Sequence, residues 1–214
     1  MGRIRAVAAQ INLRGWCEAN AGNISVNVSP ELNSIIGDTA QWFIVSRTGS
    51  RYRDLAVDPL CNLVLISIQN GLEHIHPQGG KPTSEWLCHL SLQQHFLSEN
   101  RDDRVVLHSH PASVIVLGGL ELYQNEGLLN QALDDALPEL HLYLPQGVAT
   151  TPTSPPGSKE LAECSLRAIG SRKVLVWQGH GIVSTGLDPD EALDFMEVAE
   201  KAAQVLLRKF SLTK

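Results

Sequence analysis

The chain of 214 residues contains 19% charged and 43% hydrophobic residues and has a formal net charge of −6, which predicts one compact globular domain over residues 1–214. The acidic balance is unfavourable for binding nucleic acids, and no apolar run is long enough to cross a membrane. With no secretory signal pattern, and with four scattered cysteines that form no Cys-x-x-Cys pair, the chain is expected to be cytoplasmic.

The first third of the chain is predicted to contain one helix followed by strands. Apolar spacing indicates a helix over about residues 3–15, and alternating apolar and polar residues indicate a strand at Ile24–Val28. Two more strands are expected at Trp42–Val45 and Leu63–Ile68, the second buried on both faces. A polar loop over Gly71–Pro82 follows them.

Helices and strands are then expected to alternate to the end of the chain. Thr83 or Ser84 can cap a helix that runs to about Asn100, whose predicted buried stripe is Leu87, Leu90, Leu92 and Phe96. The later strands are predicted at Arg104–His108, Leu140–Leu144 and Lys173–Trp177, and the later helices at about Ser113–Leu120, Ser158–Ile169 and Asp188–Phe210. This alternation predicts an α/β fold in which helices cover one sheet.

His108-Ser109-His110 closes one of these predicted strands and has the clearest chemical meaning. Residues i and i+2 of a strand point to the same face, so both imidazoles can reach one ion. His180 lies between two glycines, which permit a tight turn after another predicted strand. Three neutral histidines leave one ligand position open, which is the pattern of a catalytic divalent-metal site. The other histidines are expected to bind no metal: His74, His76, His89, His95 and His141.

Glu85 and two short loops could complete a site around such a metal. Glu85 lies near a predicted helix start, where a carboxylate can either complement the helix dipole or serve as an acid–base group. The loops Asn20–Asn23 and Thr48–Ser50 could surround an anion with backbone N–H groups. Together with Ser84 they favour a phosphorylated substrate.

Several ordered segments resemble those of the class II aldolase/adducin family: Trp16–Ser25, Pro82–Glu85, His108–His110, Gly179–Gly181 and Ala199–Leu206. The similarity covers nearly the whole chain. It is strongest to the members that act on L-rhamnulose 1-phosphate, although Arg47 stands where the family commonly has a small residue. The resemblance implies a three-layer α/β/α fold with a central mixed, mainly antiparallel sheet. It also implies a homotetramer with active sites at subunit interfaces.

The resemblance also assigns roles to particular residues. It implies that one zinc ion per chain binds His108, His110 and His180. Glu85 would be the catalytic general base, and Glu139 a second catalytic carboxylate offered across a subunit interface. The substrate phosphate and nearby oxygens would be bound by Asn20, Asn23, Thr48, Gly49 and Ser84.

The activity implied by the resemblance is that of a zinc-dependent lyase. It would reversibly cleave a ketose 1-phosphate, L-rhamnulose 1-phosphate or a similar one, into dihydroxyacetone phosphate and an aldehyde such as lactaldehyde. Two alternatives on the same fold are dehydration of methylthioribulose 1-phosphate and epimerisation of a sugar phosphate. A non-catalytic adducin-like module is disfavoured, because such a module has no need of three histidines together with Glu85.

Overall fold

A computed structural model describes residues 1–212, so the last two residues of the predicted 1–214 domain lie outside the described part. Within residues 1–212 the strands form an eight-stranded sheet with the order β4-β3-β2-β1-β5-β8-β7-β6. The strands are β1 (Asn23–Asn27), β2 (Gln41–Ser46), β3 (Leu63–Gln69), β4 (Leu72–His76), β5 (Val105–Ser109), β6 (Ala149–Thr151), β7 (Val174–Trp177) and β8 (Gly181–Gly186). Every neighbouring pair is antiparallel except β6 and β7. The predicted mixed, mainly antiparallel sheet is confirmed.

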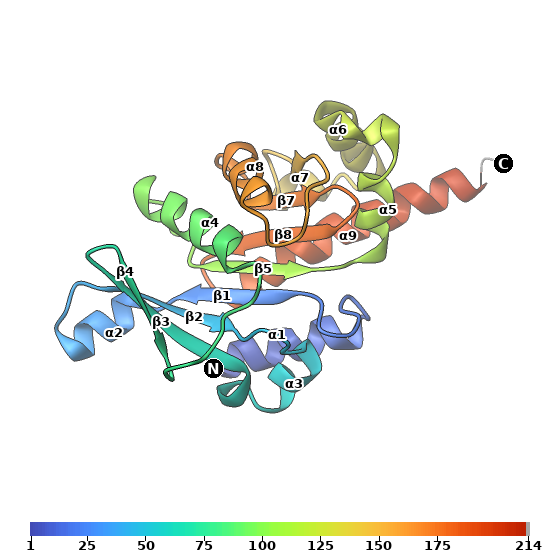
Figure 1. The fold of residues 1–214 in the computed structure, drawn as a ribbon. Helices are drawn as coiled ribbons and strands as arrows, with labels where there is room; N and C mark the ends of the chain where they lie inside the picture. The colour runs from blue at the N-terminus through green and yellow to red at the C-terminus, as the bar shows by residue number, and fades with distance from the viewer. Residues whose placement is uncertain (213–214) are drawn as a thin grey trace.

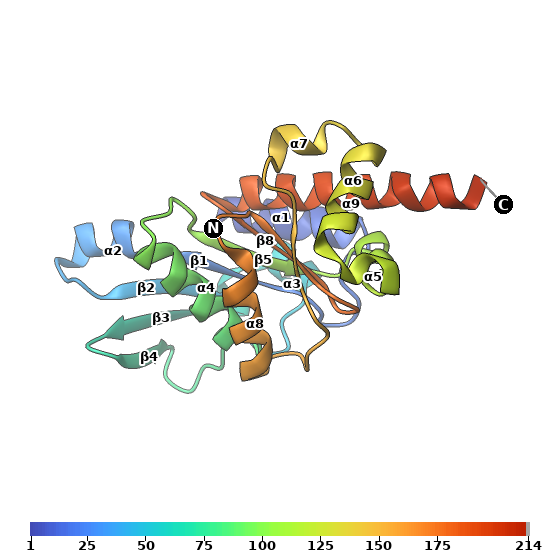
Figure 2. The same ribbon diagram turned by 90° about the horizontal axis from the view of Figure 1, so that it is seen from above.

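Helices cover both faces of this sheet, as Figures 1 and 2 show. The helices are α1 (Gly2–Leu13), α2 (Ser29–Ile36), α3 (Tyr52–Val57), α4 (Trp86–Ser98), α5 (Ala112–Gly118), α6 (Glu126–Ala136), α7 (Leu140–Tyr143), α8 (Lys159–Ile169) and α9 (Pro189–Leu212). One apolar cluster joins α1, α3, α5, α6 and α9 to one face, and a second joins α4 and α8 to the other face. The predicted three layers are therefore present.

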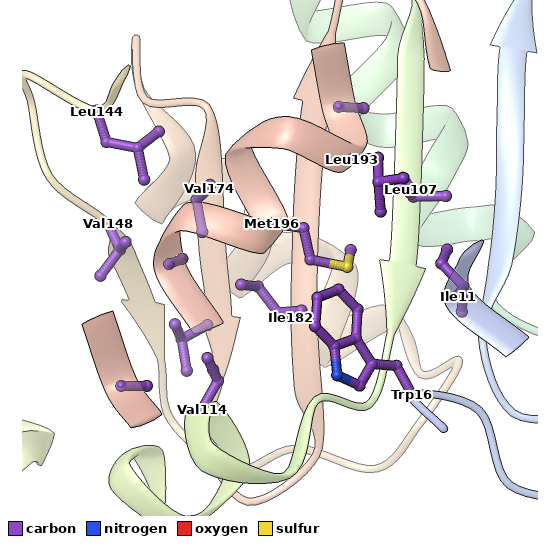
Figure 3. Close-up of a cluster of buried hydrophobic side chains, with 14 of the residues drawn as sticks. Ile11, Trp16, Leu107, Val114, Leu144, Val148, Val174, Ile182, Leu193 and Met196 are labelled. Carbon is purple, nitrogen blue, oxygen red and sulfur yellow. The ribbon is translucent and has the colours of Figure 1, made fainter. Parts of the chain in front are cut away.

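Side-chain alternation along β5 explains how the two layers attach to one sheet. Val105 and Leu107 point into the cluster under α9, whereas Val106 points into the cluster under α4 and α8. Figure 3 shows the first cluster, in which Leu193 and Met196 of α9 lie over the strands. Full burial of one such side chain contributes about 1.5–3 kcal/mol. The same alternation places His108 on the face covered by α4 and α8.

The prediction of a strand at Leu140–Leu144 is wrong, because this segment forms the short helix α7. Leu140 and Leu144 are buried, while Leu142 is 78% exposed. A spacing of i and i+4 places two side chains on one helical face, so the apparent alternation of leucines is equally compatible with a helical turn.

Three predictions around α4 are also wrong: the polar loop before it, the burial of Leu87, and the capping of the helix by Thr83 or Ser84. The expected polar loop Gly71–Pro82 contains strand β4, which pairs with β3 and lies at the edge of the sheet. Leu87, placed in the predicted buried stripe of α4, is exposed. The N-cap of α4 is Glu85 and no side chain caps it; Thr83 Oγ1 instead accepts a hydrogen bond from the Glu85 backbone N–H.

The structure adds elements that the sequence patterns did not predict: α2, α3, α6, β6 and β8. The most consequential is β8, which lies between β5 and β7 and antiparallel to both. It brings the turn that contains His180 beside the end of β5. In the described chain, no helix combines the length and the apolar character that a membrane crossing requires.

Candidate metal and substrate site

The three predicted histidine ligands converge at the end of the β5–β8 pair. His108 is in β5, His110 follows that strand, and His180 lies in the turn between β7 and β8. One ligand atom from each ring lies within 4.8 Å of those of the other two. His108 and His180 both pack against Trp177, with ring centroids 4.5 and 5.1 Å away. The tight turn predicted for His180 is confirmed.

The hydrogen bonds of the ring nitrogens fit a bound cation. His108 Nδ1 donates to the Ile182 carbonyl at 2.9 Å, and His110 Nδ1 donates to the Glu18 carboxylate at 2.7 Å. In the neutral rings, Nε2 of His108 and Nε2 of His110 therefore both carry lone pairs, and these atoms lie 3.2 Å apart. Facing lone pairs repel unless a proton or a cation lies between them. This is the donor arrangement that a divalent metal requires.

The electrostatic surroundings keep two of these rings neutral. Burial lowers the pKa of His108 well below its usual value, and the neighbouring His110 and His180 lower it further. Burial likewise lowers the pKa of His180. Although partial burial raises the pKa of the Glu18 carboxyl, its hydrogen bonds and the nearby imidazoles outweigh this, and the pKa is lowered. Neutral imidazoles beside an ionised outer carboxylate favour metal binding.

Two glycines allow the strands to approach closely enough to form this cluster. A Cβ on Gly181 would lie 2.6 Å from the Ser109 carbonyl oxygen and 3.0 Å from the His108 ring. A Cβ on Gly22 would lie 2.5 Å from the ring of Tyr52, and Gly22 also has a φ of +79°. A larger residue at Gly181 would therefore push β8 away from β5, and one at Gly22 would clash with Tyr52 of α3 and with the His108 carbonyl of β5.

Glu85 faces the histidines, as its predicted role requires. Its Oε2 lies 3.5 Å from His108 Nε2, and its Oε1 lies 3.4 Å from His180 Nε2. The carboxylate is 5% exposed and Oε2 accepts a hydrogen bond of 2.7 Å from Asn23 Nδ2. The side chain of Asn23, predicted to surround the substrate, thus directly contacts the predicted base.

The predicted substrate loops and the metal cluster share one cavity of about 300 Å³. Its lining residues are Asn20, Ala21, Gly22, Asn23, Arg47, Thr48, Gly49, Ser50, Thr83, Ser84, Glu85, His108, His110, Pro156 and His180. Thr48 Oγ1 donates to the Pro82 carbonyl at 2.5 Å, which ties this loop to the segment that leads into Glu85. Arg47 donates to the Cys61 carbonyl at 3.2 Å.

Glu139 is the one predicted site residue that the fold does not bring to this cavity within the chain. It is exposed immediately before α7, in a separate groove that also contains Trp16, Glu200 and Lys201. Its role across a subunit interface remains a prediction.

Three residues of the site or its support were not predicted. Glu18 orients His110, Pro156 lines the cavity from the loop before α8, and His89 lies behind Glu85. Glu18 and Pro156 lie in irregular segments whose sequence has no period. His89 follows Glu85 by four residues, one helical turn, and this spacing is the signal that could have identified it.

Comparisons with known proteins agree with this geometry. The profile of the class II aldolase and adducin N-terminal domain family matches residues 3–207. The rhamnulose-1-phosphate aldolase of Bacteroides thetaiotaomicron is 29% identical, over 96% of this chain and 84% of that protein. The rhamnulose-1-phosphate aldolase of Listeria welshimeri is also 29% identical, over 91% and 77% of the two chains.

Solved structures show the same similarity. A sugar-phosphate aldolase from Thermotoga maritima has a TM-score of 0.86 at 30% identity, covering 100% of this chain and 97% of that one. An L-fuculose 1-phosphate aldolase has a TM-score of 0.73 at 19% identity, covering 99% and 86% of the two chains, which is a likeness of fold.

Proposed function

Because this chain belongs to the class II aldolase and adducin family, we propose that it is a metal-dependent aldolase, a lyase acting on a ketose 1-phosphate. The proposed reaction is the reversible cleavage of L-rhamnulose 1-phosphate, or a similar sugar, into dihydroxyacetone phosphate and an aldehyde such as lactaldehyde. The observation that carries the proposal is Glu85, whose carboxylate lies 3.4–3.5 Å from two of the three converging histidines. Relatives named rhamnulose-1-phosphate aldolase support the choice of sugar.

The proposed cofactor is one zinc ion per chain, held by His108, His110 and His180. Three converging imidazoles, two of which have outer hydrogen-bond partners on Nδ1, are a donor set that suits zinc. When bound there, the metal would polarise substrate oxygens and stabilise negative charge on them.

Glu85 is proposed to move the proton at the reacting carbon of dihydroxyacetone phosphate. In synthesis its carboxylate takes the proton from carbon, and in cleavage it returns the proton to the same carbon. Asn23 holds Oε2, while Oε1 faces His180 in the wall of the cavity.

The substrate phosphate is proposed to bind where Asn20, Thr48, Gly49 and Ser84 line the same cavity. Arg47 also lines this wall, and its guanidinium donates a hydrogen bond to the carbonyl of Cys61, which lies outside the cavity lining. A cationic residue there favours an anionic group, which supports a phosphorylated substrate.

A panel of substrates tests the proposed reaction. The zinc-loaded protein is incubated with L-rhamnulose 1-phosphate, L-fuculose 1-phosphate and methylthioribulose 1-phosphate, and dihydroxyacetone phosphate is measured. Its release from one of the first two supports the aldolase. Loss of water from the third sugar without cleavage would establish the dehydratase instead, and conversion of a sugar to its epimer would establish an epimerase.

Replacing the proposed base separates binding from chemistry. Glu85→Gln should retain zinc, because the three histidines remain, but should lose about 10²- to 10⁴-fold in turnover, the usual contribution of general acid–base catalysis. Metal content by plasma emission and turnover are measured on the same sample. Wild-type turnover in this variant would exclude Glu85 as the base.

We further propose a homotetramer in which Glu139 completes the active site of a neighbouring subunit. The support is its exposed position beside a groove, outside its own chain's metal cavity. Mixed oligomers of Glu85→Gln and Glu139→Ala chains should regain activity, because some sites then contain both native carboxylates. Mixed oligomers with no more activity than the separate variants would contradict sharing of the site.

A further inference from the structure

A buried chain of hydrogen bonds runs from Glu85 away from the cavity and joins α4 to β1. Its members are Asn23 and Ser25 of β1 and His89 and Gln93 of α4. Asn23 is 6% exposed and the other three are fully buried. His89 does not line the cavity, so it reaches the proposed chemistry only through Asn23.

The direction of every hydrogen bond in this chain follows from chemistry. An ionised carboxylate only accepts, so Asn23 donates Nδ2–H to Glu85 and turns its carbonyl Oδ1 toward His89. That oxygen also only accepts, so His89 carries its proton on Nε2. His89 Nδ1 then accepts from the Ser25 hydroxyl at 2.9 Å, and Gln93 Nε2 donates to Ser25 Oγ at 3.2 Å.

His89 has a single ring proton to place, because burial lowers its pKa to about 3 and the ring is neutral. If the Asn23 amide turned over, its Nδ2–H would meet the Nε2–H of His89, and its Oδ1 would meet the carboxylate of Glu85. Both contacts would be repulsive. The Nε2–H tautomer of His89 and the amide orientation that supports Glu85 therefore stabilise each other, because each presents a donor to the other's acceptor or accepts from its donor.

We propose that His89 is a positioning residue for the proton transfer: through its Nε2–H it orients the Asn23 amide, which in turn holds the Glu85 carboxylate with Oε1 toward the histidine cluster. The inference rests on the proposed function. If His89 only filled space between α4 and β1, the expected result would differ. Any apolar residue of similar size could then replace it without affecting proton transfer.

Proton exchange at dihydroxyacetone phosphate measures this step directly. In D2O and without an aldehyde, the zinc-loaded protein should transfer a proton from carbon to Glu85, exchange it with solvent, and return a deuteron to the same carbon. The incorporation of deuterium into dihydroxyacetone phosphate is followed by proton NMR. Since no carbon–carbon bond forms or breaks, the rate reports the proton transfer separately from the aldol step.

Two substitutions distinguish orientation from space filling. His89→Leu keeps the volume but removes the donor, and should lower kcat for exchange on the order of 10- to 100-fold with little change in KM, because a shift of about 1 Å in a catalytic group can cost 10²-fold. His89→Gln keeps an N–H near the Nε2 position and should recover most of that loss. His95→Leu, the same change elsewhere on α4, is the control and should leave exchange unchanged.

A second measurement requires no activity. Nitrogen-15 NMR of the wild-type histidine rings, with His89 assigned by its loss in the Gln variant, should show the proton on Nε2. A proton on Nδ1 would overturn the proposal, as would wild-type kcat in His89→Leu.

If the wild-type protein neither exchanges nor cleaves, the proposed function fails and the role of His89 in proton transfer fails with it. Active wild-type protein with an unaffected Leu variant refutes only the inference.

Discussion

The β5–β8 strand pair has a polar cluster with a buried member at each end, and only one of the two clusters has all its hydrogen-bonding groups paired within the described chain. At the start of β5, the Asp103 carboxylate accepts hydrogen bonds on both oxygens, from Arg101 Nε at 2.8 Å, Lys173 Nζ at 2.9 Å and Thr185 Oγ1 at 2.9 Å. At the other end, His108 and His110 turn lone pairs toward each other at 3.2 Å.

The difference separates stabilisation from binding. A carboxylate whose oxygens are all paired with cations and a hydroxyl has nothing left to bind, and its burial at 4% exposure is compensated. Facing imidazole nitrogens have unsatisfied acceptors that a cation would satisfy. Each cluster has one buried polar group at its centre, Asp103 or His108, so burial alone does not identify the functional cluster; the completeness of its hydrogen bonds does.

The largest effect is expected at the histidine end. His108→Gln should abolish stoichiometric zinc binding. It should also lower the rate of aldol cleavage by about 10³-fold or more, because a Lewis-acid metal stabilises the transition state by several kcal/mol. Zinc content and the release of dihydroxyacetone phosphate are measured on the same sample. A variant that binds one zinc per chain with native activity would show that the cluster is not the metal site.

The aspartate end should affect folding and not zinc. Asp103→Asn leaves Arg101 and Lys173 without their counter-ion, so the free energy of unfolding should fall by about 3 kcal/mol, the low end for breaking a buried ion pair. Urea unfolding measures this. Asp102→Asn, the same change at an exposed neighbour, should leave stability nearly unchanged. Loss of zinc in Asp103→Asn without loss of stability would contradict the assignment of this end of the strand pair to stabilisation and not to binding.

The wild type and the Asp103→Asn variant also allow a test of the pH dependence of stability. Burial raises the pKa of Asp103, but the hydrogen bond from Lys173 and the charge of Arg101 outweigh this, so the folded-state pKa lies below its usual value. A lowered pKa contributes stability above the unfolded value of about 3.9, and this stability is lost as pH falls through the folded value. In metal-free protein, the stability difference between wild type and Asp103→Asn should therefore shrink below about pH 4. A difference independent of pH would exclude the ionised pair.

The smallest effect is expected at Glu18, the outer partner of His110. Glu18→Gln keeps the acceptor for His110 Nδ1–H but removes the charge, and zinc affinity should fall by about tenfold, the lower end of the range for an outer partner. The low end applies because the side chain is 70% exposed. Competition with a fluorescent chelator measures affinity, with Glu99→Gln as an exposed control. An unchanged affinity would mean that His110 is oriented without Glu18.

Most strands and helices were predictable because their signals are local. The period of two in Ile24–Val28 and the apolar spacing of α1 and α9 reflect backbone geometry that a short segment sets by itself. Leu140–Leu144 and β4 were mispredicted because short segments fit more than one period. For β8 the run Gly181–Gly186 has a glycine at each end and small polar residues, and only its neighbours β5 and β7 make it a strand.

The sequence by itself predicted that His108 and His110 lie together at the end of a strand and that Glu85 lies at the start of a helix, because the local apolar pattern identifies both ends. Tertiary structure decided that His180 joins them, that Ile182 and Glu18 accept hydrogen bonds from Nδ1 of His108 and His110, and that His89 contacts the Asn23 side chain behind Glu85. The hydrogen bonds of His108 and His110 join residues 74 and 92 positions apart. Partners so distant meet only through the order of strands in the sheet, which no local period encodes.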